Sequence, residues 1–80
     1  MYELYCDHKT YHMHLPLTAR SIASAIKETM SYADAAAMRK HDNLYRLFGP
    51  EGFVVAISVL GGRVKVHPDV TIPKEHWDYR

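Results

Sequence analysis

Two histidines stand two positions apart in the segment Thr10–Leu15. Residues two apart on a strand project to the same face of a sheet. If this segment pairs with the N-terminal strand, Glu3 is expected opposite His14. The side chains of His12, His14 and Glu3 could then hold a divalent metal with an open position. The same spacing is also typical of the wet face of an edge hairpin, and no third His or Cys ligand is placed. We predict no metal and no cofactor, and keep a histidine-site metal protein as an alternative.

The single cysteine, Cys6, alternates with Leu4 in a strand-like segment and is expected to face the core as a small apolar group. A catalytic thiolate requires a base and electropositive surroundings. His8 is close in sequence, but it lies at a predicted turn with no group to orient it. One cysteine allows no internal disulfide, which is typical of a reducing compartment. An intermolecular disulfide is left open, if the first strand is an exposed edge.

The sequence contains no phosphate-binding or catalytic motif that we can place. The run Gly49–Gly52 offers proline and glutamate where a phosphate-binding loop would offer amides and a lysine. Glu28 and Asp34 have no evident partner for acid–base catalysis, and no Ser-His-Asp arrangement can be assembled. We therefore predict that the protein is not an enzyme and has no catalytic residues.

A basic and aromatic face is expected on one side of the sheet. Its expected members are Arg63, Lys65 and His67 from the last strand, and Tyr5, His12 and His14 from the first hairpin. Aromatic and basic groups on an open sheet can stack on bases and contact phosphate. A nucleic-acid-binding domain is therefore the main alternative function. Ala56, Ser58 and Leu60 share this face and make it less similar to an RNA-binding platform.

The tail after His67 contains two prolines and the single tryptophan, Trp77. A tryptophan near a terminus commonly docks over the edge of the core. Trp77 could instead anchor a partner, because Trp, Tyr and Arg dominate binding hot spots. The predicted partner-binding residues are Tyr5, His12, Arg63, Lys65 and Trp77.

The strongest structural signal is a hairpin formed by Phe53–Leu60 and Arg63–His67. The two glycines between them supply the positive φ of a two-residue turn. Pairing Leu60 with Arg63 gives one aliphatic face and one polar face, and a slip of one residue would put a lysine in the core. The aliphatic face consists of Ile57, Val59, Val64 and Val66, which we expect to be buried under Ile22, Ile26 and Met30.

A second hairpin is predicted from Tyr2–Asp7 and Thr10–Leu15, turning at His8 and Lys9 with Asp7 opposite Thr10. His-Lys is not a favoured pair for a two-residue turn, so the alternation of side chains is the main support for this pairing. The expected apolar pairs are Cys6 with Tyr11, Leu4 with Met13 and Tyr2 with Leu15.

A helix is predicted to follow, with Thr18 as its N-cap and with Leu17 and Ile22 as a hydrophobic staple. Apolar residues at spacings of three and four form one stripe along it. The stripe comprises Ala19, Ile22, Ala23, Ile26, Met30, Ala33 and Ala37. A break near Tyr32 is an alternative, because Ser31–Asp34 could be a capping box that starts a second helix.

The segment Leu44–Phe48 fits either the last turn of a helix closed by Gly49 and Pro50 or a third strand. We favour a strand, because Asp42 and Asn43 are poor helix-interior residues and a strand would cover the edge of the next one. The predicted fold is a single α+β domain over residues 1–80. It has a small antiparallel sheet of about five strands, in the order β-β-α-β-β-β, with one long or kinked helix on one face.

Composition narrows the functional classes. The chain has 80 residues, 48% of them hydrophobic, with ten basic and nine acidic residues and a net charge of +1. A dedicated nucleic-acid binder usually carries a strong basic excess. No stretch approaches the ~18 apolar residues of a membrane span, and the N-terminus lacks the pattern of a signal peptide. We therefore expect a soluble cytoplasmic protein that has no membrane partner.

These observations favour a small non-catalytic protein-binding module. Stand-alone domains of this size often act as stoichiometric inhibitors of larger protein machines, as phage-encoded inhibitors of bacterial defence systems do. That comparison rests on size and on the lack of a catalytic constellation. The expected partner is a protein, with nucleic acid as the alternative. A homodimer is also predicted, because small sheets have exposed edges that pair unless blocked.

Overall fold

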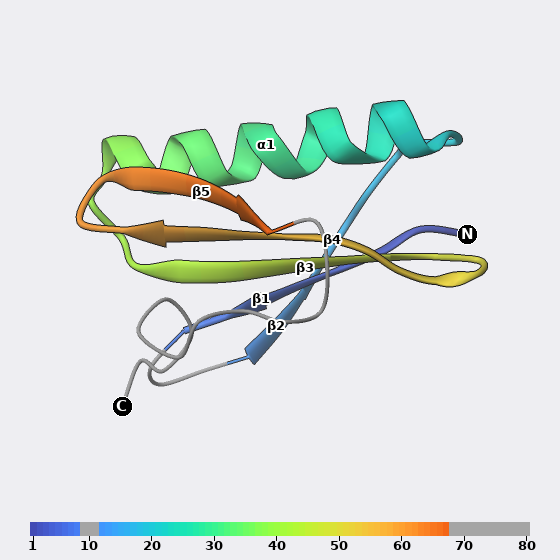
Figure 1. The fold of residues 1–80 in the computed structure, drawn as a ribbon, viewed down its shortest axis with the longest axis horizontal. Coiled ribbons are helices and arrows are strands. Elements are labelled where there is room, and N and C mark those ends of the chain that lie inside the picture. Colours follow the sequence, from blue (N-terminus) through green and yellow to red (C-terminus); the bar gives the residue numbers. More distant parts are fainter. Residues whose placement is uncertain (9–11, 68–80) are drawn as a thin grey trace.

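A five-stranded antiparallel sheet and one helix laid along one of its faces make up the part of the protein that the structure describes (Figure 1). The structure is a computed structural model and describes residues 1–8 and 12–67. The elements in chain order are β1 (Glu3–Asp7), β2 (His12–Leu15), α1 (Ile22–Met38), β3 (Asn43–Gly49), β4 (Gly52–Leu60) and β5 (Arg63–His67). This order confirms the predicted α+β class. It also confirms the assignment of 44–48 to a strand.

The strands lie in the order β2-β1-β3-β4-β5. The predicted β4–β5 register is confirmed, with Leu60 opposite Arg63 and Val59 opposite Val64. Gly61 and Gly62 have φ angles of 58° and 80°. Positive φ at both central residues is the requirement of a type I′ turn, whose twist matches that of the flanking strands.

The N-terminal hairpin forms with a different register from the predicted one. Asp7 lies opposite His12 rather than Thr10, and Cys6 lies opposite Met13 rather than Tyr11. The pairing is thus shifted by two residues, and a longer connection replaces the two-residue His-Lys turn. Because side chains alternate with period two, a shift of two residues leaves each side chain on its predicted face.

The helix begins later than predicted, and Thr18 is not its N-cap. Ser21 has extended backbone angles, and its Oγ accepts a hydrogen bond from the Ser24 N–H at 3.2 Å. Ile22 is therefore the first helical residue and is exposed, so the predicted hydrophobic staple with Leu17 is wrong. The helix is continuous from Ile22 to Met38, without the alternative break near Tyr32.

The buried line of the helix only partly matches the predicted stripe, with which it shares Ala33. Its buried residues are Ala25, Thr29, Ala33 and Ala36. The Thr29 hydroxyl donates to the Ala25 carbonyl at 2.8 Å, which satisfies its polar group within the helix. Small side chains on this line let the helix lie close to the strands, while the bulkier Ile26 and Met30 are only partly buried on its flanks.

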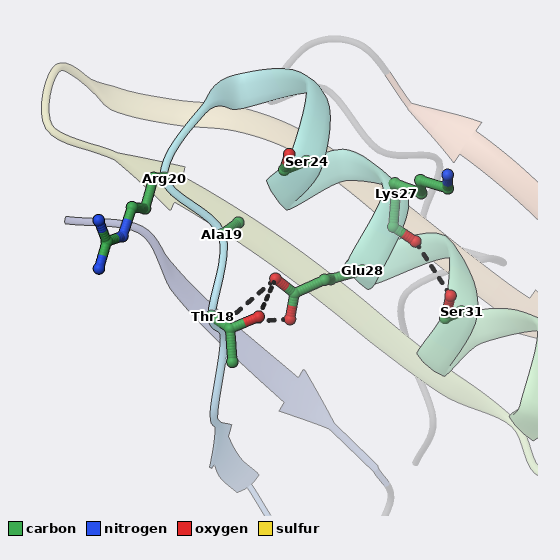
Figure 2. Close-up of a pocket in the computed structure, with 7 residues that line it drawn as sticks. All are labelled: Thr18, Ala19, Arg20, Ser24, Lys27, Glu28 and Ser31. Atoms are coloured by element: carbon green, nitrogen blue, oxygen red, sulfur yellow. Dashed lines mark hydrogen bonds between the residues drawn. The ribbon is translucent and has the colours of Figure 1, made fainter.

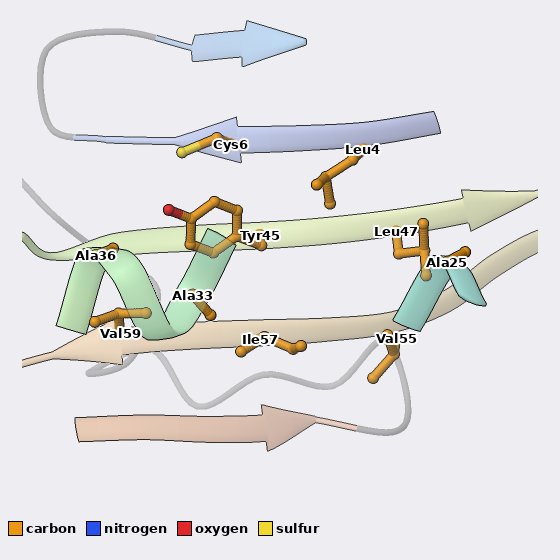
Figure 3. Close-up of a cluster of buried hydrophobic side chains, with 10 residues drawn as sticks. All are labelled: Leu4, Cys6, Ala25, Ala33, Ala36, Tyr45, Leu47, Val55, Ile57 and Val59. Carbon is orange, nitrogen blue, oxygen red and sulfur yellow. The ribbon is translucent and has the colours of Figure 1, made fainter. Parts of the chain in front are cut away.

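The main core lies between α1 and the middle of the sheet (Figure 3). It is formed by Leu4, Cys6, Ala25, Ala33, Ala36, Tyr45, Leu47, Val55, Ile57 and Val59. Val66 was predicted to belong to this core but is 50% exposed. It sits on the edge strand β5, whereas α1 makes most of its contacts with β4 and β3. Among the described residues, no helix has the length and apolar character needed to cross a bilayer.

Candidate binding face

The sheet face turned away from α1 carries most of the polar side chains of the strands. We call it the polar face. The register places on it Glu3, Tyr5, Asp7, His12, His14, Arg46, Ser58, Arg63, Lys65 and His67. The six residues predicted to share one side of the sheet do share it. Their role as partner-binding residues stays a prediction.

The centre of the β2–β1–β3 half of this face is a buried carboxylate, Asp7. Its side chain is only 5% exposed, and its Oδ1 lies 2.7 Å from Nδ1 of His12. Its other oxygen lies 2.9 Å from Nε of Arg46 in an ion pair. A buried charge without partners is strongly destabilising, so Asp7 can occupy this position because β2 and β3 each supply a partner. The three residues tie the N-terminal hairpin to the rest of the sheet.

Beside Asp7, the second histidine of β2 contacts an aromatic ring at a tilted angle of 59°. Tyr5 rather than Glu3 lies opposite His14, and the two rings are 5.0 Å apart between centroids. Glu3 is placed diagonally, with its Oε1 3.6 Å from His14 Nε2. This departs from the predicted pairing of Glu3 with His14. Within the described residues no group of three or more His, Cys, Asp or Glu side chains could hold a metal ion.

The β4–β5 half of the polar face contains a Ser–His contact. Ser58 Oγ and His67 Nε2 are 2.9 Å apart, and both residues are buried. A serine nucleophile must reach its substrate, but Ser58 is enclosed together with Leu44 and Ala56. We interpret this pair as a cross-strand hydrogen bond that satisfies two polar groups.

Cys6 lies on the helix side of β1 and is buried, as predicted. Burial raises the pKa of its thiol, the nearby charge of Asp7 raises it further, and a hydrogen bond with the Tyr45 side chain partly opposes both effects. Nucleophilic thiols need the opposite shift. β1 is also an interior strand, so the condition for an intermolecular disulfide through Cys6 is not met.

The exposed residues of the predicted site lie at the two margins of the polar face. His12, whose side chain is 80% exposed, stands on edge strand β2. Arg63 and Lys65 are exposed on the opposite edge strand, β5. Tyr5 is partly buried on β1. Trp77 lies outside the described residues.

Two residues of this face were missed by the sequence analysis, Asp7 and Arg46. Arg46 is the only charged residue within the otherwise apolar run Leu44–Phe48. A charged side chain in such a strand needs a partner when it is part of a sheet. The need of Arg46 for an acidic partner could have pointed to Asp7, because Asp7 and Glu3 are the only charged residues in the first predicted strand.

A second surface lies along α1, where a shallow groove has a volume of about 530 Å³. Figure 2 shows the residues that line this groove. Its polar centre is the Glu28 carboxylate, which accepts from the Thr18 N–H at 3.1 Å and from the Thr18 hydroxyl at 3.0 Å. Arg20 and Lys27 point away from this carboxylate (Figure 2). The contacts of the groove therefore hold the connection between β2 and α1 against the helix.

No family model, no curated protein and no solved structure matches this chain.

Proposed function

We propose that the protein is a small non-catalytic module that binds a protein partner through its polar face. The observation that carries the proposal is the placement of exposed His12, Arg63 and Lys65, with the partly exposed ring of Tyr5, on one face of a continuous sheet. Arg and aromatic side chains contribute most to protein-binding hot spots. Strands also hold such side chains in place before binding, which lowers the ordering cost of association.

The charges of this face indicate the chemistry of the partner. The buried carboxylate Asp7 already has two partners, His12 and Arg46. Arg63 and Lys65 present exposed cationic groups on β5. Complementary charge across an interface steers association and excludes wrong partners. The surface therefore suits an acidic patch on a folded protein.

We propose that the protein is a stoichiometric inhibitor of a larger protein machine. It would inhibit by occupying a surface of that machine. Phage-encoded inhibitors of bacterial defence systems are the class of protein that we consider. A single buried thiol, Cys6, is compatible with a reducing compartment, so we propose the cytoplasm as the site of action.

Nucleic acid remains the second candidate ligand, because Tyr5, Arg63 and Lys65 could contact bases and phosphates. Two features favour a protein partner over it. Glu3 and Asp7 place carboxylates on the same face, and Arg46 is paired with Asp7 instead of standing alone. Both features reduce the positive potential that phosphate binding requires.

The test is affinity capture from the lysate of the native host, with and without nuclease, compared among matched variants. We expect a protein to be captured in a fixed ratio and to be lost with the double variant Arg63→Ala/Lys65→Ala. A control pair on the helix, Lys27→Ala/Arg39→Ala, removes the same number of cations from exposed positions and should leave capture unchanged. Equal capture by both double variants would show that the polar face is not the binding surface. Loss of all capture after nuclease would favour the nucleic-acid alternative.

A further inference from the structure

We propose that β2 is the pairing edge of a zinc-bridged homodimer, in which His12 and His14 of two chains together bind one Zn²⁺. The site is incomplete in a single chain, and the second copy supplies the missing ligands. This proposal concerns the edge of the sheet and does not depend on which partner the polar face binds.

β2 is the edge strand best suited to a second copy of the chain. Among the described residues it pairs with β1 alone, and β5 pairs with β4 alone, so each has one open edge. Exposed edges pair with other chains unless they are blocked, and Lys residues on an edge are a common block. β5 carries Arg63 and Lys65, whereas β2 has the sequence His-Met-His-Leu and no permanently charged side chain.

An antiparallel pair of β2 strands related by a two-fold axis at Met13 brings the histidines of both copies together. Met13, which is 47% exposed, would face Met13 of the second copy on the helix side. On the polar face, His12 of each chain would face His14 of the other. Opposed residues have Cβ atoms roughly 5 Å apart, and residues two apart on a strand are separated by about 7 Å. Four imidazoles in this rectangle can reach one ion at Zn–N distances of about 2.0–2.1 Å.

The contact of His12 with Asp7 prepares the imidazole for this role. An ionised carboxylate can only accept, so at 2.7 Å the Nδ1–H of His12 donates to Asp7 and Nε2 is left for a metal. Histidine ligands of zinc almost always donate their other N–H in this way, which fixes the orientation of the ring. Asp7 is itself buried and held by Arg46, so the arrangement exists before any metal arrives.

The second ligand, His14, is also available. Its Nε2 is 3.6 Å from Glu3, which is longer than a hydrogen bond. One chain thus offers two imidazoles, and the described residues contain no group of three potential ligands. Structural zinc sites almost always have four ligands. The two-fold pairing supplies four, with one Asp7 carboxylate per chain behind them to orient the His12 rings.

The experiment measures the mass of untagged protein by light scattering after gel filtration, in EDTA and with added zinc chloride, together with the zinc content. We expect the mass of one chain in EDTA and of two chains with zinc, at one zinc per two chains. His12→Ala and His14→Ala should each remain single chains with zinc. His41→Ala removes another exposed histidine, beyond the end of α1, and should dimerise as the parent does.

A second variant separates edge pairing from histidine chemistry. Met13→Glu keeps both histidines but puts like charges at the two-fold axis, so it should stay a single chain with zinc. The proposal is overturned if the parent stays a single chain in saturating zinc, or if a dimer persists in EDTA. It is equally overturned if Met13→Glu dimerises with zinc, or if His41→Ala loses the dimer as fully as His12→Ala does.

Discussion

Two identical substitutions on the same face of the sheet should have very different effects on stability. Val59 on β4 is 0% exposed and packs in the core, where Figure 3 shows it beside Ala36 of α1. Val59→Asp would forfeit about 1.5–3 kcal/mol of apolar burial and would bury an unpaired carboxylate at a cost of several kcal/mol more. An 80-residue domain has a total stability of about 4–12 kcal/mol. We therefore expect Val59→Asp to be unfolded.

Val66 on β5 is the matched control, because it is 50% exposed and faces the same side as Val59. An aspartate at position 66 can keep its carboxylate hydrated, so Val66→Asp should lower the free energy of unfolding by about 1 kcal/mol. The assay is urea unfolding of both variants followed by circular dichroism. A folded Val59→Asp protein would refute the register, and unfolding of both variants would refute the placement of α1 mainly over β3 and β4, with Val66 at the margin of the core.

Three further changes test local features. Ser21→Ala should cost about 1 kcal/mol in urea unfolding, because it removes the N-cap, whereas Thr18→Ala, on the exposed connection, should cost less. Asp7→Asn should cost about 2 kcal/mol by the same assay, because it removes the charge that Arg46 and His12 contact; an unchanged midpoint would contradict the structural role given to Asp7. Since burial raises the pKa of Cys6 from 9.0, its stabilising contribution is complete below about pH 9 and is lost as pH rises through the higher folded-state value. Cys6→Ala should therefore lose less stability than the parent between pH 8 and pH 11, as measured by urea unfolding of both proteins. If the free energy of unfolding falls equally with pH in both, the raised pKa of Cys6 is contradicted.

Local patterns were sufficient to predict the register and the turn of the β4–β5 hairpin. The two glycines define the turn, and the alternation of Val and polar residues from Arg63 to His67 defines the faces. The β1–β2 hairpin was predicted less completely. Alternation indicates which face a side chain occupies, but it does not change when the register shifts by two residues. The register there depends on the length of the connection, for which the sequence has no glycine signal.

The helix interface and the polar face depended on contacts that no local pattern specifies. The buried line of α1 includes Thr29, which a search for large apolar residues passes over. Thr29 can be buried because its hydroxyl donates a hydrogen bond inside the helix. The pairing of Asp7 with Arg46 joins β1 to β3. Which strand lies beside β1 is decided by the whole topology, so the sequence could suggest that Arg46 needs a partner but could not name it.

The interior position of β1 has a consequence for how the chain folds. The strands within β1–β2 and within β3–β4–β5 follow one another closely in sequence and can form from local pairing alone. The seam between them joins β1 to β3 across roughly 40 residues of intervening chain, with α1 in that interval. Closing so long a loop is entropically costly, so we expect this seam to be the slow step of folding. Until it closes, the inner edge of β1 is exposed next to Cys6 and Leu4, and a nascent chain would be most prone to aggregation at that stage.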